Sequence, residues 1–198
     1  MMGERGGRDR FVVLDGWRGI CALFVALFHF RALDHFYLLP FFRNSYLFVD
    51  FFFVLSGFVI THAYGGRIVH REDAIVFMIR RFGRLWPLHA AVLAALVCAE
   101  LVKAILVSWP GMLNNPRIPP FTGSTSVAAL ATNLLLGHSF GLHDNLTWNG
   151  PSWSISAEFY AYAAFAVTSL LAPRRFSAVA CVLAALGALV VAARSPLY

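Results

Sequence analysis

Charged side chains are scarce in this 198-residue sequence: 13% of the residues are Asp, Glu, Lys or Arg, whereas 59% are hydrophobic. Its mean hydropathy is +0.68. A soluble globular domain usually has about 25% charged residues, so this class of protein is excluded. Several apolar runs approach the length of about 20 residues that a helix needs to cross a bilayer. The sequence therefore predicts an all-α fold, a polytopic transmembrane helix bundle with about 5–6 membrane helices.

Cysteine is also rare, and the first apolar run does not resemble a cleavable signal peptide. Cys21, Cys98 and Cys181 lie inside apolar runs without the spacing of metal ligands, so we expect them to be packing residues and predict no metal site. The charged N-terminus precedes an apolar stretch that Arg18 interrupts and that lacks a small-residue cleavage site. The first apolar run is therefore predicted to be an uncleaved helix.

The net charge of +6 comes from arginines that lie between the apolar runs. This placement is typical of the positive-inside rule and of contact with membrane lipids, and it argues against a nucleic-acid partner. Arg5, Arg8 and Arg10 precede the first run, and a basic stretch from Arg67 to Arg84 follows the second. The sequence therefore predicts a multi-pass protein of the inner (plasma) membrane with a cytoplasmic N-terminus.

The apolar runs predict helices over 11–31, 46–64, 86–107, 152–172 and 177–193. Residues 108–126 are rich in Pro, Gly and Asn and form a loop. The run 127–140 is short for a full crossing and is predicted to be re-entrant or half-spanning. If it crossed, Arg174 and Arg175 would lie outside, so the arginines favour the re-entrant alternative.

Two ionisable residues interrupt the first helix. Arg18 and His29 are eleven residues apart, which brings them to within about 20° of one face and about 16 Å apart along the axis. Asp15 lies on the same stripe. Ionisable residues inside a membrane are functional by default. The alternative is that Arg18 pairs with Asp15 and that His29 bonds a neighbouring helix.

Further polar groups accompany the later helices. Arg80, Arg81 and Arg84 can hold phosphates bidentately, or they can bind lipid headgroups and set topology. Glu158 lies well inside an apolar helix, and no Lys or Arg nearby in sequence can pair with it. We expect its partner to come from another helix, with Arg18 or His29 as candidates, in a catalytic arrangement or in a structural ion pair.

Four segments, taken in order, resemble the membrane acyltransferase family 3, the bacterial integral-membrane O-acyltransferases. The first contains Asp15, Gly16, Arg18 and Gly19 and ends in an Arg-x10-His pattern at His29. The others are VDFFFVLSGF at 49–58, RRFGRLWPLH at 80–89 and WSISAEF at 153–159. They cover the N-terminal half of the family domain, so residues 1–198 are expected to form a single domain that is incomplete at its C-terminus.

The resemblance implies transfer of an acyl group, usually acetyl, from cytoplasmic acyl-CoA to a hydroxyl of a cell-surface carbohydrate or lipid-linked glycan. Acetyl-CoA would be a co-substrate, with no bound cofactor. His29 would act as general base or transient acyl carrier, Arg18 would stabilise negative charge, and Glu158 would orient or charge-balance His29. Some family members have a second acidic residue directly after the glutamate, and this sequence has Phe159 at that position. The expected substrate-binding residues are Asp15, Arg80, Arg81, Arg84, Ser154 and Ser156.

Two other functions fit the same residues. A proton-coupled transporter would use Arg18, His29 and Glu158 as a proton relay. A catalytically silent membrane fragment would fit the end of the sequence at Tyr198.

Overall fold

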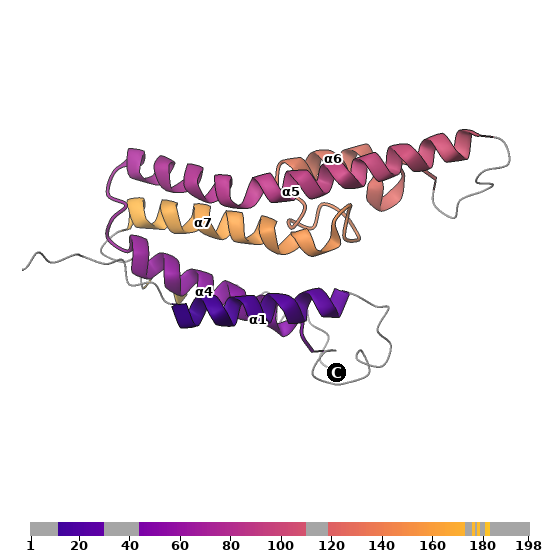
Figure 1. Cartoon of the computed structure of the whole chain (residues 1–198). Coiled ribbons are helices and arrows are strands. Elements are labelled where there is room, and N and C mark those ends of the chain that lie inside the picture. Colours follow the sequence, from indigo (N-terminus) through magenta and orange to yellow (C-terminus); the bar gives the residue numbers. More distant parts are fainter. Residues whose placement is uncertain are drawn as a thin grey trace, which may run out of the picture. The chain divides into compact units, whose positions relative to one another are not determined.

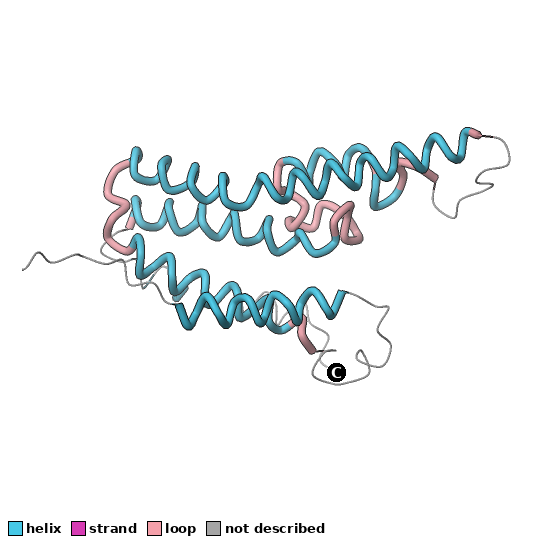
Figure 2. The backbone as a smooth tube through the Cα atoms, viewed as in Figure 1, coloured by secondary structure: helices cyan, strands magenta, loops and turns pink. Residues whose placement is uncertain are grey.

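The computed structural model describes residues 12–29, 44–109 and 119–172, together with residues 176, 178, 181 and 182. Every regular element within these residues is a helix (Figure 2). The chain divides into two compact units, Met1–Ala63 and Tyr64–Tyr198. The predicted all-α fold is confirmed.

The first unit contains an antiparallel helix pair. Helix α1 spans Val12–His29 and helix α4 spans Leu47–Tyr64, close to the predicted ranges 11–31 and 46–64. The ring of Phe24 stacks on that of Phe48 with centroids 5.7 Å apart, and Phe28 lies 6.2 Å from Tyr46. The end of α1 therefore lies beside the start of α4.

The second unit is built on one long helix, α5, which spans Arg71–Ser108. The predicted start near residue 86 is wrong, because the basic stretch is already helical from Arg71. Asp73 stabilises this earlier start: its carboxylate accepts hydrogen bonds from the backbone N–H groups of His70 at 2.9 Å and Val69 at 3.2 Å. With 38 residues, α5 is about 57 Å long and contains Pro87 in its interior.

Two shorter segments connect α5 to the final described helix. The 3-10 helix η1 spans Gly123–Thr125, and α6 spans Val127–Leu134. The eight residues of α6 cover only about 12 Å, so α6 alone is too short to cross a bilayer, as predicted for the 127–140 run. The 3-10 helix η2 at Gly150–Ser152 then leads into α7, Trp153–Leu171.

Helices α7 and α6 cover different parts of α5 (Figure 1). The ring centroids of Phe77 and Phe165 are 5.7 Å apart, and those of Phe82 and Phe159 are 6.0 Å apart. Since the numbers rise along α5 and fall along α7, these two helices are antiparallel. Further along α5, His89 Nε2 donates a hydrogen bond to the backbone oxygen of Asn133 at 3.0 Å. The first part of α5 thus packs against α7 and a later part against α6.

Three helical segments of the described residues are long and apolar enough to cross a membrane: Leu47–Tyr64, Arg71–Ser108 and Gly150–Leu171. A shorter apolar helix covers Gly19–His29. The predicted helix at 177–193 falls mostly outside the described residues. These segments define an integral-membrane protein.

Candidate active site

His29 is the last residue of α1 and is exposed. Its Nδ1 lies 2.8 Å from the backbone oxygen of Val25. A carbonyl oxygen only accepts, so Nδ1 carries the hydrogen and donates it. In the neutral ring, Nε2 then keeps its lone pair. This arrangement can accept a proton or an acyl group at Nε2.

The predicted stripe on α1 has a continuous helical backbone. Arg18 and Asp15 both lie within Val12–His29, so their predicted positions on one face with His29 hold for the backbone. The side chains of Arg18 and Asp15 fall outside the described part of the chain. Their predicted roles therefore stay predictions.

Glu158 has a partner on its own helix. The hydroxyl of Tyr162, one turn later on α7, donates a hydrogen bond to Glu158 Oε1. We expected a partner from another helix and did not predict this one, although helical spacing places Tyr162 on the same face of α7. One turn before Glu158, the half-exposed Ser154 donates its hydroxyl to the Pro151 carbonyl at 3.0 Å.

The three arginines of the basic stretch have two different environments. Arg80 and Arg84 are exposed on α5, whereas Arg81 is half-buried. The guanidinium carbon of Arg81 lies 5.2 Å from the ring centroid of Tyr64. It lies 5.4 Å from that of Phe77 and 5.5 Å from that of Tyr162. We call these three rings the aromatic cage.

Ser156 is fully buried at the junction of α7 with the preceding connection. Its hydroxyl donates to the backbone oxygen of Leu136 and lies 2.7 Å from Ser139 Oγ. The hydroxyl thus ties residues 136–139 to the first turns of α7. Its contacts are those of a group that supports the helix start.

Sequence reasoning missed a buried histidine pair. The rings of His89 and His138 are nearly parallel, at 7°, with centroids 5.7 Å apart. His89 is 1% exposed. His138 Nε2 lies 3.0 Å from the hydroxyl of Ser152, which donates to the Asn149 carbonyl. Burial lowers the pKa of His138 from its ordinary value. No spacing rule connects residues from α5 and a distant connection, so only the fold reveals this pair.

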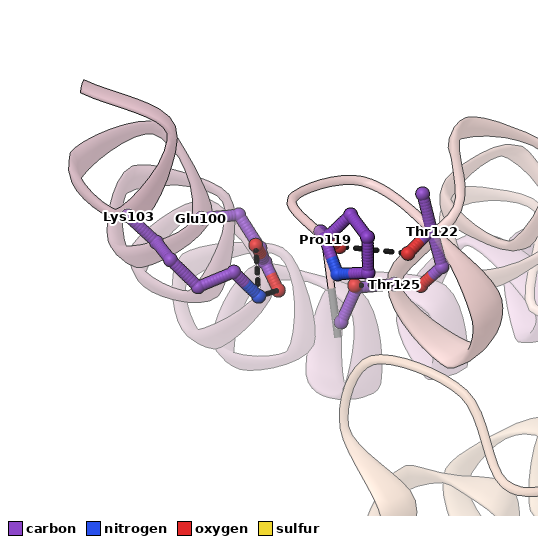
Figure 3. Close-up of polar contacts among 5 residues, drawn as sticks. All are labelled: Glu100, Lys103, Pro119, Thr122 and Thr125. Atoms are coloured by element: carbon purple, nitrogen blue, oxygen red, sulfur yellow. Dashed lines mark hydrogen bonds and ion pairs between the residues drawn. The ribbon is translucent and has the colours of Figure 1, made fainter. Parts of the chain in front are cut away.

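A buried carboxylate was also missed. Glu100 on α5 is 8% exposed and forms an ion pair of 2.8 Å with Lys103, one turn later. Figure 3 shows this pair beside the segment that carries Pro119, Thr122 and Thr125. Opposite charges three residues apart on a helix face each other, so the i,i+3 spacing is a signal that predicts the pair.

The three membrane-length helices among the described residues define the class as an integral-membrane protein. The family model described as "Acyltransferase domain" matches residues 11–196. The chain therefore belongs to the acyltransferase 3 family, and its enzyme class is acyltransferase.

Two relatives are similar to the chain, and the second of them is named as an acyltransferase. "Protein 2 in picA locus" of Rhizobium radiobacter is 34% identical over 165 residues, which are 80% of this chain and 82% of the relative. "Acyltransferase MdmB" of Streptomyces mycarofaciens is 34% identical over 119 residues, 59% of this chain but 26% of that protein. The chain thus spans most of the first relative and about a quarter of the second. No solved structure matches the chain.

Proposed function

We propose that this chain transfers an acetyl group from acetyl-CoA to a hydroxyl of a cell-surface carbohydrate or lipid-linked glycan. Residues 1–198 belong to one acyltransferase domain in the inner membrane, with a cytoplasmic N-terminus. The observation that carries the proposal is the hydrogen bond from His29 Nδ1 to the Val25 carbonyl, because it prepares Nε2 as a base.

His29 acts on the acceptor hydroxyl. Nε2 takes the proton as the hydroxyl oxygen attacks the thioester carbonyl carbon, and the new C–O bond forms. The tetrahedral intermediate then collapses, the C–S bond breaks, and the CoA thiolate leaves. The imidazolium returns its proton to this thiolate, so the products are the ester and free CoA, with His29 neutral again.

The other ionisable residues support this step. Arg18, on the same helix as His29, stabilises the negative charge that develops on the thioester oxygen. Asp15, three residues before Arg18, contributes to substrate binding with it. Glu158 balances the positive charge that His29 gains in the reaction, and Tyr162 sets the orientation of this carboxylate within α7.

The exposure of each side chain indicates which residues are available to bind acetyl-CoA, the acyl donor. Arg80 and Arg84 are exposed on α5, which supports a role in holding the phosphates of CoA. Ser154 is half-exposed and is kept as a substrate contact, whereas the buried hydroxyl of Ser156 is assigned to supporting the start of α7. Substituting both Arg80 and Arg84 by Ala should raise the KM for acetyl-CoA.

His29→Ala is the first test of the proposal. Membrane vesicles that contain the chain receive acetyl-CoA with a labelled acetyl group, and CoA release and label transfer to glycoconjugate are both followed. Wild type should transfer the label. Loss of the base in His29→Ala should lower the rate by about 10²–10⁴-fold, the usual contribution of general acid–base catalysis.

His62→Ala is the matched control for this test. His62 is also an exposed histidine in the last turn of a helix of the first unit. Its replacement should leave the rate unchanged at equal expression. Full activity of His29→Ala would remove His29 from the mechanism. Solute flux across the vesicle membrane without consumption of thioester would indicate a transporter instead.

A further inference from the structure

We infer that Arg81 is a positioning residue that acts through Tyr162 on Glu158, and that it is not a ligand of the donor phosphates. This inference rests on the proposed function, because it concerns the carboxylate of that same reaction. The inference gives Arg81 a different role from Arg80 and Arg84, although the sequence predicts the same role for all three.

The aromatic cage accounts for the position of the Arg81 guanidinium. Its carbon lies 5.2–5.5 Å from the three ring centroids of Tyr64, Phe77 and Tyr162, distances at which a cation is attracted to a ring face. The Arg81 Nε atom is buried and finds no hydrogen-bond partner among the described residues. At this atom, aromatic faces thus take the place of a hydrogen-bond partner.

The cage connects different parts of the second unit. Tyr64 comes from the end of α4, Phe77 from α5 and Tyr162 from α7. The buried ring of Phe77 contacts both others, with centroids 4.9 Å from Tyr64 and 6.1 Å from Tyr162. Because the Tyr162 ring contacts both Phe77 and Arg81, its orientation depends on these two residues. Arg81 is thus engaged by the three rings, whereas Arg80 and Arg84 are exposed on α5.

The Tyr162 hydroxyl connects the aromatic cage to the Glu158 carboxylate. Tyr162 is 4% exposed, and its hydroxyl donates to Glu158 Oε1. A cation on the ring face draws electron density from a phenol, which makes its O–H a stronger donor. Arg81 therefore acts in two ways: it holds the ring in place, and it strengthens the hydrogen bond that orients Glu158.

The test compares Arg81→Met, which keeps an unbranched apolar stem and removes the charged group, with Tyr162→Phe, which removes only the hydroxyl. Both should lower kcat by about tenfold and leave the KM for acetyl-CoA within about twofold of wild type. The double variant should be no slower than the slower single variant, because both changes break one connected path. Arg81→Lys should recover part of kcat, since an ammonium group is also attracted to ring faces.

Two kinetic outcomes would overturn the inference. A rise in the KM for acetyl-CoA with unchanged kcat in Arg81→Met would make Arg81 a donor ligand, as expected for Arg84→Ala. Multiplying losses in the double variant would show that Arg81 acts independently of Tyr162. Arg67→Ala, which changes an exposed arginine before α5, is the control and should match wild type.

A spectroscopic measurement separates the inference from the proposed function. In the full-length chain with 3-fluorotyrosine at position 162, Arg81→Met should shift the fluorine resonance, and Arg67→Ala should not. An unchanged resonance in Arg81→Met overturns the contact whatever the activity. Failure of the wild type to transfer acetyl overturns the proposed function, and any catalytic role of Arg81 with it, while the resonance still reports on the cage.

Discussion

At the scale of single residues, His138 links folding to pH. Burial lowers the pKa of its imidazole, so the folded protein binds this proton less readily than the unfolded chain, whose histidine titrates near pH about 6.5. Where the unfolded state binds more protons, stability rises with pH. The contribution of neutral His138 is therefore complete above the unfolded pKa. It is lost as the pH falls from there towards the lower pKa of the folded state.

His138→Gln tests this dependence. Glutamine does not titrate, and its side-chain amide can still donate to Ser152 Oγ in place of the His138 ring nitrogen. The melting temperature of the wild type in detergent should fall between pH 8 and pH 5, and the fall should be smaller in His138→Gln. Equal slopes in the two proteins would show that other groups carry the whole pH dependence.

The sequence predicted the relative placement of two residues only where both lie on the same helix. The 3.6-residue period was enough to place Arg18 and His29 on one stripe of α1. It did not predict that Arg81 would differ from Arg80 and Arg84, because the cage is built by rings from three helices. A search for charged partners also passed over the Tyr162 hydroxyl, which is uncharged.

At the scale of elements, Ser156 is the clearest single link between α7 and the connection before it. Its hydroxyl bonds both the Leu136 carbonyl and Ser139. Ser156→Ala leaves buried groups without a partner, which costs about 1–3 kcal/mol. In a protein of this size, about 2–4 °C is lost from the melting temperature for each kcal/mol.

Ser154→Ala is the matched control for that change. Ser154 is half-exposed and donates one hydrogen bond to Pro151, so its removal should lower the melting temperature less than removal of Ser156. Both are measured by thermal unfolding of the detergent-solubilised chain. Equal effects would show that the connection does not depend on the Ser156 hydroxyl.

Helix boundaries were predictable where hydropathy changes sharply. Helices α4 and α7 agree with prediction to within a residue or two at each end. The start of α5 was placed fifteen residues too late, at 86 instead of Arg71, because a charged stretch without an apolar run resembles a loop. Side-chain capping by Asp73 makes the earlier turn stable, and hydropathy is insensitive to capping.

At the scale of the whole molecule, the antiparallel pairing of α5 and α7 bears on topology. Because Phe165 lies beside Phe77, the end of α7 is near the start of α5. Residues that follow α7 should then be on the same side of the membrane as Arg71. This supports the re-entrant alternative for the 127–140 run, in which the connection at 141–151 stays on the far side.

Cysteine labelling tests this topology. In a chain whose native cysteines are replaced by Ala, Arg71→Cys should react only with reagent supplied from the cytoplasmic side. Asp144→Cys should react only from the opposite side. Both positions are exposed. Labelling of the two from one side would show that the 127–140 run crosses the membrane.

Membership of the family was predictable from four short segments in order, and the family model confirms it over residues 11–196. The acyl group and acceptor were not predictable in the same way. Their recognition depends on side chains brought together from distant parts of the chain, and sequence spacing does not report such proximity.

Pro87 has a mechanical consequence for the long helix α5. Proline has no N–H, so the carbonyl of Gly83 loses its usual donor four residues later, and Gly83 adds no side chain to stiffen this turn. Helix α7 holds the stretch before it through Phe77 and Phe82. Helix α6 holds both sides of it, because its backbone oxygens accept hydrogen bonds from Trp86 Nε1 and His89 Nε2. Helix α6 therefore braces the turn of α5 that has the lowest bending stiffness.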